Sequence, residues 1–185
     1  GGRMGRRRHT VHGLVEFDIT DARQAIRRHR AKTGDNVSFA AFFLFCLGKA
    51  IDEDRHVHAY RNWRRQFVVF DEVDVNMLFE VEVEGAKTIR PHILRGVNTR
   101  SLREIDEEIR RFRSGHGESQ ESKFIAWFVR LPGFLRRIFL RILFRMPWLI
   151  KDYYGTVLVT MVGMFGKGSG WGIPVPNHSL QLTLG

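Results

Sequence analysis

The sequence contains one cysteine, Cys46, among 185 residues, which excludes a disulfide within the chain. Cys46 lies in the apolar run 39–47, and this context predicts a buried thiol in a reducing compartment. Residues 1–9 have no apolar segment behind their arginines, so no secretory signal is visible. No charge-free run approaches the ~20 residues of a membrane-spanning helix. These absences predict a cytoplasmic protein, with a peripheral membrane contact left open.

Sequence motifs of several enzyme classes are also missing. No Gly-x-Ser-x-Gly, Cys-x-x-Cys or Walker-type motif occurs, and the glycine-rich run 166–170 lacks P-loop spacing, so we interpret it as a flexible hairpin. His56 and His58 follow three acidic residues at 52–54, a grouping that could hold a metal ion. No outer partners for such ligands are apparent. We therefore interpret this stretch as a solvated helix end and expect no metal cofactor.

Positive charge is concentrated in two segments of the chain. The net charge is +10, and residues 1–10 hold four arginines and no acid. The segment 122–151 also lacks acids and carries Lys123, Arg130, Arg136, Arg137, Arg141, Arg145 and Lys151. This distribution predicts a nearly neutral body with two basic attachments. It does not favour a nucleic-acid partner, because aliphatic side chains rather than stacking aromatics separate most of the basic residues.

The length of 185 residues predicts one domain, and the hydrophobic pattern predicts both helices and strands. A hydrophobic content of 43%, with fifteen phenylalanines, is enough for a bulky core. Ser38 and Ser101 are expected to cap the second and third helices, and Gly34 to end the first. Helices are predicted over 21–32, 39–54 and 102–113, and strands over 11–19, 66–70, 73–83, 88–94, 156–162 and 180–184.

The segment 124–150 is unusually apolar for one that also carries many arginines. It contains 18 large apolar side chains in 27 positions. Pro132 and Gly133 divide it into two predicted helices, and Pro147 is expected to end the second. In the second helix the large apolar residues form one face, and Arg137, Arg141 and Arg145 recur every four residues on another.

So many apolar side chains must be covered, because burying each one is worth about 1.5–3 kcal/mol. The domain's own sheet or a neighbouring subunit could cover the segment 124–150. A partner protein could also cover it. A membrane surface is a further alternative, because the aromatic rings would enter the headgroup region while the arginines meet anionic lipid.

The C-terminal part of the chain carries the most distinctive motif. Residues 155–166 read Gly-Thr-Val-Leu-Val-Thr-Met-Val-Gly-Met-Phe-Gly, followed by a turn, Ile-Pro-Val-Pro-Asn-His, at 173–178 and a strand ending in Leu184-Gly185. This order resembles the catalytic domain of the dihydrolipoamide acyltransferases of 2-oxo acid dehydrogenase complexes, where the strand typically reads Gly-Thr-Phe-Thr-Ile-Ser-Asn-Leu-Gly-Met-Phe-Gly. The resemblance extends with lower specificity to 38–50, 73–76 and 101–105.

The resemblance implies an α/β (α+β) fold of the chloramphenicol acetyltransferase type. Such a domain has two layers, with helices on one face of a mixed β-sheet. We expect residues 1–185 to form one incomplete catalytic domain of this kind, with an inserted amphipathic helical pair at 114–154. The resemblance also implies a homotrimer or larger homo-oligomer.

The chemistry implied by the resemblance is transfer of an acyl group between a thioester and a thiol. Coenzyme A is the expected substrate, as acyl-CoA or beside an acyl-lipoyl group. In the family a Ser or Thr hydroxyl stabilises the tetrahedral oxyanion, and Thr160 occupies that position here. Met161, Gly163 and Asn177 accompany it in the matched motifs. With His12, which alternates with strand-like residues, they are the candidates for contact with substrate or CoA.

The family's catalytic base lies in a His-x-x-x-Asp-Gly motif, which does not occur in these 185 residues. We therefore expect the chain to be truncated before this motif and inactive by itself. His178, in the Pro-Asn-His turn, is the nearest histidine to the matched motif that could serve instead. The alternative to an enzyme is a non-catalytic assembly scaffold or a membrane-associated protein that uses the basic segment 123–150.

Overall fold

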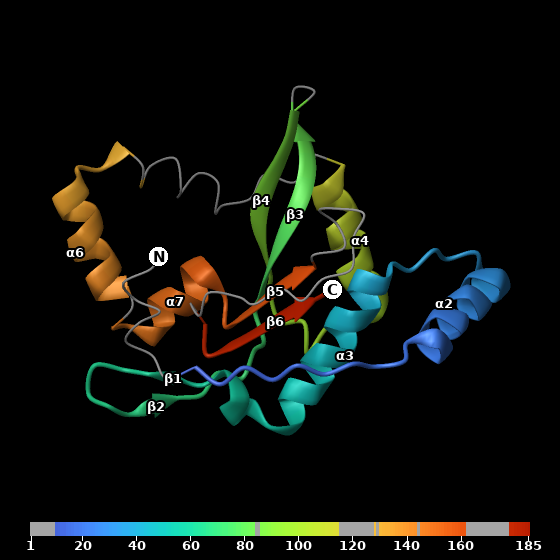
Figure 1. Cartoon of the computed structure of the whole chain (residues 1–185), viewed down its shortest axis with the longest axis horizontal. Helices are drawn as coiled ribbons and strands as arrows, with labels where there is room; N and C mark the ends of the chain where they lie inside the picture. The colour runs from blue at the N-terminus through green and yellow to red at the C-terminus, as the bar shows by residue number, and fades with distance from the viewer. Residues whose placement is uncertain (1–9, 84–85, 115–127, 129, 144, 162–177) are drawn as a thin grey trace.

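The computed structural model describes residues 10–83, 86–114, 128, 130–143, 145–161 and 178–185, and only the backbone for 80–83, 86 and 87 (Figure 1). Gly163 and Asn177, like the glycine-rich run 166–170, lie outside the described residues. The described residues include no helix that combines the length and the hydrophobicity of a membrane span.

A four-stranded mixed sheet forms the centre of the molecule, in the order β4-β3-β5-β6. Strands β3 (Val75–Val83) and β4 (Ala86–Leu94) form an antiparallel hairpin. Strand β5 (Val157–Met161) pairs in parallel with β3, and β6 (Leu180–Leu184) pairs in parallel with β5. The strands predicted at 73–83, 88–94, 156–162 and 180–184 are confirmed within two residues at each end.

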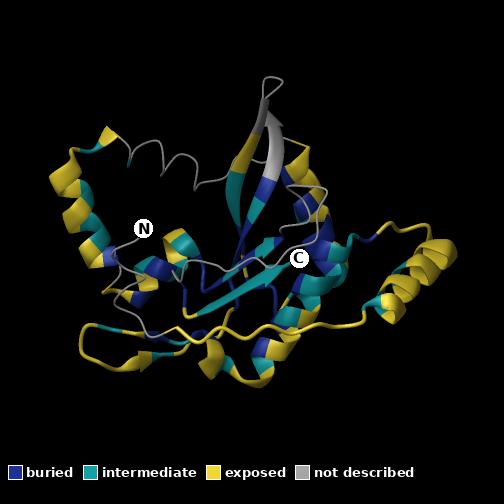
Figure 2. Cartoon of the chain, viewed as in Figure 1, coloured by how far each residue is buried: buried dark blue, intermediate teal, exposed yellow. Residues whose placement is uncertain are grey.

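Two helices cover one face of this sheet and enclose the core. Helices α3 (Phe39–Glu53) and α4 (Leu102–Arg113) pack against each other and share one hydrophobic cluster with β3, β5 and β6. Figure 2 shows the buried residues gathered where these elements meet. The sheet residues of the cluster alternate, with Val157, Val159 and Met161 facing the helices on β5. The predicted two-layer fold, with helices on one face of a mixed sheet, is confirmed.

Both predicted serine caps are present. The Ser38 side chain accepts a hydrogen bond from the Ala41 backbone N–H, and Ser101 forms a reciprocal capping box with Glu104. The Asp106 carboxylate accepts a hydrogen bond from the Ser38 backbone N–H at 2.8 Å, which joins the start of α3 to α4. These local signals therefore also fix how the two helices sit on the sheet.

Helix α7 (Pro147–Tyr154) is held on the sheet by a buried acid. The Asp74 side chain is 1% exposed and accepts hydrogen bonds from Arg95 Nη1 and the Gly96 backbone N–H, each at 2.9 Å. Arg95 also donates to the backbone carbonyls of Lys151 and Asp152 at the end of α7. Gly155 then turns the chain at φ 73°, where a Cβ atom would stand 2.8 Å from the Asp74 carbonyl oxygen.

Helix α6 (Gly133–Leu143) precedes α7 and is mostly exposed (Figure 2). Pro147 does not simply end a helix, as expected, but starts α7, because proline lacks the N–H that the first turn leaves unpaired anyway. The predicted division at Pro132 and Gly133 agrees with the start of α6. The segment that precedes it, 115–127, is outside the described residues.

The strand predicted over 11–19 is wrong. Residues 10–19 belong to no strand, and Val11, Val15 and Phe17 are exposed. Alternation of apolar residues indicates a strand only where another strand supplies hydrogen-bond partners. The next helix, α2 (Thr20–Thr33), is present as predicted and ends at Gly34, but none of its residues is buried.

Two other burial predictions are also wrong. Cys46 is exposed, because α3 buries only one side against the sheet and Cys46 lies on another. His58 is not solvated but fully buried, in a 3-10 turn (Arg55–His58) that leads to the β1–β2 hairpin, Tyr60–Arg61 and Phe67–Val68. Its neighbour His56 is exposed and lies 3.1 Å from the Asp54 carboxylate.

We expect His58 to make the fold less stable in mild acid. Burial lowers its pKa below 6.5, outweighing the opposing effects of the Phe70 backbone and the Asp74 charge. The unfolded chain therefore binds a proton more readily, and stability falls as the pH drops below about 6.5 toward the lower pKa of the folded state. Urea unfolding between pH 7 and 5 should show a smaller loss of stability in His58→Gln than in the unsubstituted protein. His56→Gln is the matched control, and an equal change in both variants would contradict this origin.

Candidate functional site

Thr160 lies on the outer face of the sheet, the face opposite α3 and α4. Its neighbours in β5, Val159 and Met161, are buried toward the core, so strand alternation directs Thr160 outward, where it is half-buried. Within the described part of the chain, its hydroxyl makes no hydrogen bond. The group is therefore free to donate to a ligand on this face.

Other polar side chains share the outer face with Thr160. Thr183 of β6 is the direct register partner of Thr160. Gln181 pairs with Leu158, two residues before Thr160 in β5 and on the same face. Asn76 of β3 pairs with Leu158 from the other side and donates to the Tyr154 carbonyl at 3.1 Å. The buried Oδ1 atom of Asn76 has no hydrogen-bond partner among the described residues. Strand pairing thus gathers hydroxyl and amide groups from three strands.

The other predicted binding residues that the structure describes do not lie with Thr160 on the outer face of the sheet. Met161 is 9% exposed and packs into the core, so its side chain does not share a surface with Thr160. His12 is exposed on the unpaired segment 10–19, not on a strand. The roles predicted for Gly163 and Asn177 stay predictions, because both residues lie outside the described part of the chain.

His92 belongs to a polar cluster on the core side of the sheet. It pairs with Met77 across the hairpin, its Nε2 lies 2.8 Å from Glu108 Oε1, and its ring stacks on Phe112. Burial raises the pKa of Glu108, but hydrogen bonds from His92 and Arg100 outweigh it and hold this pKa below the usual value. The sheet separates His92 from the Thr160 face, so it cannot act there as a base.

His178 lies at the opposite end of β5 and β6 from Thr160. It precedes β6, whose first residue, Leu180, pairs with Val157 at the start of β5. At about 3.3 Å per strand residue, Thr160 is on the order of 10–16 Å from His178 along the strands. The His178 Nε2 atom is 2.9 Å from the Tyr154 carbonyl oxygen. The geometry therefore gives His178 a role in attaching α7 rather than in acid–base chemistry at Thr160.

Sequence analysis did not identify Asn76, Gln181 or Thr183 as neighbours of Thr160. Asn76 lies 84 residues before Thr160, and Gln181 and Thr183 lie 21 and 23 residues after it, so only the register of β3, β5 and β6 aligns them. In the described part of the chain, no group of three or more His, Cys, Asp or Glu could hold a metal ion. The hydroxyl of Thr160 and the polar groups of Asn76 and Thr183 give the outer face hydrogen-bonding groups for a polar or developing anionic atom.

No protein-family model and no curated protein matches the chain. Several solved structures share its fold. One is a truncated catalytic core of the 2-oxoacid dehydrogenase multienzyme complex from Thermoplasma acidophilum, with 14% identity and a TM-score of 0.54; the match covers 90% of this chain and 64% of that one. A probable dihydrolipoamide acetyltransferase from Listeria monocytogenes is 15% identical, with a TM-score of 0.52 and coverages of 89% and 58%.

The dihydrolipoamide acetyltransferase of Azotobacter vinelandii matches in the same way. It is 14% identical, with a TM-score of 0.51 and coverages of 87% and 56%. In that enzyme a serine, a histidine and an asparagine have been studied for their roles in the catalytic mechanism. At this identity the likeness establishes the fold, which the sequence resemblance predicted. The chain spans less than two thirds of the length of each of these three structures.

Proposed function

We propose that the protein is a coenzyme A-dependent acyltransferase, and that the outer face of β5 and β6 is its reaction surface. One observation carries the proposal. The Thr160 hydroxyl, at the position where the family resemblance expects an oxyanion donor, lies half-exposed and without a partner in the described chain. The shared fold with acyltransferase cores supports it.

The proposed reaction exchanges one thioester for another. A base takes the proton of the acceptor thiol, and the thiolate attacks the carbonyl carbon of the acyl donor. The carbonyl oxygen becomes an oxyanion, and the Thr160 O–H donates a hydrogen bond to it. Collapse of the tetrahedral intermediate breaks the original C–S bond, and the departing thiolate takes up a proton. Acyl-CoA is the proposed donor and dihydrolipoamide the acceptor, and in the reverse direction acyl-dihydrolipoamide donates to CoA.

None of the described histidines shares the outer face next to Thr160, because His92 is on the core side and His178 lies at the far end of the strands. We therefore propose that the base reaches Thr160 from outside the described surface, including from a neighbouring subunit. Thr183 and Asn76 lie close enough in register to orient the substrate.

The proposal is tested by incubating the protein, in the form that its gene encodes, with acetyl-CoA and dihydrolipoamide. Mass spectrometry follows formation of S-acetyl-dihydrolipoamide, with isobutyryl-CoA and succinyl-CoA as further donors. We expect at least one donor to react faster than the protein-free background, in proportion to protein concentration. Rates equal to background with every donor would contradict an acyltransferase function and favour the scaffold alternative.

We also propose that the protein assembles into a homotrimer or a larger homo-oligomer. Two of the solved structures that share its fold are cores of multienzyme complexes. In this chain the unpaired segment 10–19 exposes Val15 to 63% and Phe17 to 80%, which a partner subunit would cover. The protein would act in the cytoplasm as this assembly.

Replacing Val15 and Phe17 together by serine should weaken the assembly. The exposed side chains contribute little to the fold of a single chain, so their loss should lower the average mass in sedimentation-velocity runs while circular dichroism shows that the chain stays folded. Val57→Ser, which changes an exposed apolar residue outside the segment, is the control. A monomeric unsubstituted protein, or an unchanged mass in the double variant, would contradict the proposed assembly through this segment.

A further inference from the structure

Helix α6 is apolar on two sides, and only one of them is packed. Leu143 is fully buried, whereas Phe134, Ile138 and Ile142, spaced four residues apart, form a stripe on the other side that is about half exposed. Covering such side chains is favourable by about 0.8 kcal/mol per buried methylene group. The stripe of Phe134, Ile138 and Ile142 is therefore exposed to solvent, unlike the buried hydrophobic core of the described chain.

Arginines flank this exposed stripe. Arg137 and Arg141 lie one helical turn apart on the adjacent side of α6, and both are exposed. In the described part of the chain, neither guanidinium makes an ion pair or a hydrogen bond. Other exposed arginines do find carboxylates, as Arg55 does with Asp71 and Arg103 with Glu107. Among the described residues, no carboxylate therefore pairs with the positive charge beside the α6 stripe.

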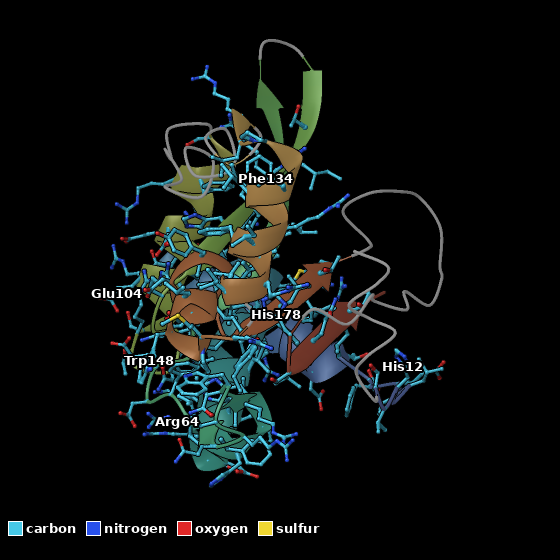
Figure 3. All side chains as sticks on the ribbon, turned by 90° about the vertical axis from the view of Figure 1, so that its left-hand side faces the viewer. His12, Arg64, Glu104, Phe134, Trp148 and His178 are labelled. Carbon is cyan, nitrogen blue, oxygen red and sulfur yellow. The ribbon has the colours of Figure 1, made fainter. Side chains whose placement is uncertain are left out.

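A second segment presents the same chemistry at the same end of the molecule. At the tip between β1 and β2, the Arg64 guanidinium lies 4.8 Å from the Trp63 ring centroid, and Trp63 is 65% exposed. Residues 55–70 contain no acid. In Figure 1, α6 and this hairpin both reach the left-hand end of the molecule. Figure 3, which views that end directly, shows Phe134, Trp148 and Arg64 running down it.

We propose that this end of the molecule docks on an anionic lipid surface. The cationic–apolar face, as we name it, consists of Trp63, Arg64, Phe134, Arg137, Ile138 and Arg141. Tryptophan, phenylalanine and aliphatic side chains enter the boundary between headgroups and acyl chains, while arginines bind lipid phosphates and the negative surface potential. The inference is independent of the proposed acyl transfer, because neither Thr160 nor its neighbours belong to the face.

Charge and hydrophobicity together favour an anionic lipid surface over a second copy of the chain or a nucleic acid. A second copy of the chain on this face would bring Arg137 and Arg141 against positive charge of the same kind, and like charges in contact repel. A nucleic acid would match the charge but would leave the aliphatic stripe of Ile138 and Ile142 without bases to stack on, since stacking needs aromatic rings. An anionic lipid surface satisfies both the charge and the apolar stripe.

Vesicle flotation of the 185-residue chain tests the proposal. Vesicles of phosphatidylcholine alone are compared with vesicles of phosphatidylcholine and phosphatidylglycerol at about 3:1, at physiological salt. We expect partitioning onto the anionic vesicles and at least about tenfold less onto the neutral ones, since each arginine near the surface contributes roughly fivefold. Absence of binding, or equal binding to both vesicles, would overturn the proposal.

The double variant Arg137→Glu/Arg141→Glu should lower partitioning onto anionic vesicles by about 10- to 30-fold, since two such contacts are lost. Arg27→Glu/Arg28→Glu changes the net charge equally at exposed positions of α2, at the opposite end in Figure 1. It should change binding less than about threefold, because salt screens charges beyond about 8 Å. Phe134→Ser/Ile138→Ser should also reduce binding while leaving the charge intact.

Equal losses in the two charge variants would overturn the proposal, because net charge rather than this face would then bind lipid. Circular dichroism and urea unfolding establish that each variant is folded. Sedimentation without vesicles tests whether a second copy of the chain binds this face instead. If the protein self-associates and Arg137→Glu/Arg141→Glu abolishes the self-association, the face belongs to a contact between copies. If the chain binds single-stranded nucleic acid but not vesicles, and Arg137→Glu/Arg141→Glu weakens that binding, the cationic–apolar face belongs to a nucleic acid.

Discussion

Thr160→Ala should lower the turnover of thioester exchange by about 10²–10³-fold, the loss typical of removing one oxyanion donor. The alanine leaves the strand intact, because Val159 and Met161 on either side carry the packing of β5. The effect should appear in kcat with little change in KM, since the hydrogen bond strengthens as charge develops on the carbonyl oxygen. Steady-state kinetics with the reactive acyl-CoA and dihydrolipoamide measures both constants.

Two further variants distinguish the contribution of the Thr160 hydroxyl from that of neighbouring groups. Thr160→Ser keeps the O–H and should retain turnover within about tenfold, because a serine hydroxyl can donate the same hydrogen bond. Thr183→Ala removes the paired hydroxyl on β6 and should raise KM more than it lowers kcat. If Thr160→Ala reacted as fast as the unsubstituted protein, Thr160 would be an ordinary strand threonine and the site would lie elsewhere.

Asp74→Ala should destabilise the fold by about 2–4 kcal/mol. It removes a carboxylate that is 1% exposed and leaves the buried Gly96 N–H without its acceptor. It also frees Arg95, whose hydrogen bonds to the Lys151 and Asp152 carbonyls hold the end of α7. Arg95 is partly exposed and regains water, which keeps the cost below that of a fully buried pair. The midpoint of urea unfolding measures the change.

Asp71→Ala is the matched control for Asp74→Ala. Its side chain is 94% exposed and forms a surface ion pair with Arg55 at 2.8 Å, so its loss should cost less than about 1 kcal/mol. Asp74→Asn should fall between the two, because the amide oxygen can still accept from Gly96 while the charge opposite Arg95 is lost. Equal midpoints for Asp71→Ala and Asp74→Ala would show that the buried acid does not hold α7.

The elements that could be predicted from the sequence carry their own local signals. Ser38 and Ser101 supply helix caps, Gly34 supplies a left-handed helix end, and the alternation in 73–83 matches a strand with one buried face. Thr160 is the candidate oxyanion donor because a motif surrounds it. In each case the residues that determine the structure lie within a few positions of one another.

The errors come from partners that are distant in sequence. The apolar alternation of 11–19 is strand-like, yet no described strand pairs with it. His58 looked like part of a solvated helix end, but Phe70 and its neighbours, brought over by the β1–β2 hairpin, bury it. Cys46 lies in a run of apolar residues, but the helix turns it away from the sheet. None of these outcomes has a local signature.

The candidate site also combines a residue that a local motif indicates with residues that only the folded sheet brings near it. Its central residue follows from the motif, whereas Asn76 and Thr183 join it only through the parallel pairing of β3, β5 and β6. Met161, next to Thr160 in sequence, is removed from the site by the same alternation that exposes Thr160. Neighbours in sequence and neighbours on the outer face are therefore different sets of residues.

An NMR titration of the ¹⁵N-labelled chain with coenzyme A tests the central claim most directly, because it locates binding without requiring the catalytic base. At physiological salt, which suppresses non-specific attraction to the basic protein, we expect saturable amide shifts at Leu158, Thr160, Gln181 and Thr183. The His92–Glu108 cluster, on the other face of the sheet, should stay unchanged. Shifts confined to α6 and the β1–β2 hairpin, or no saturable shift, would contradict an acyl-transfer site on the outer face of β5 and β6.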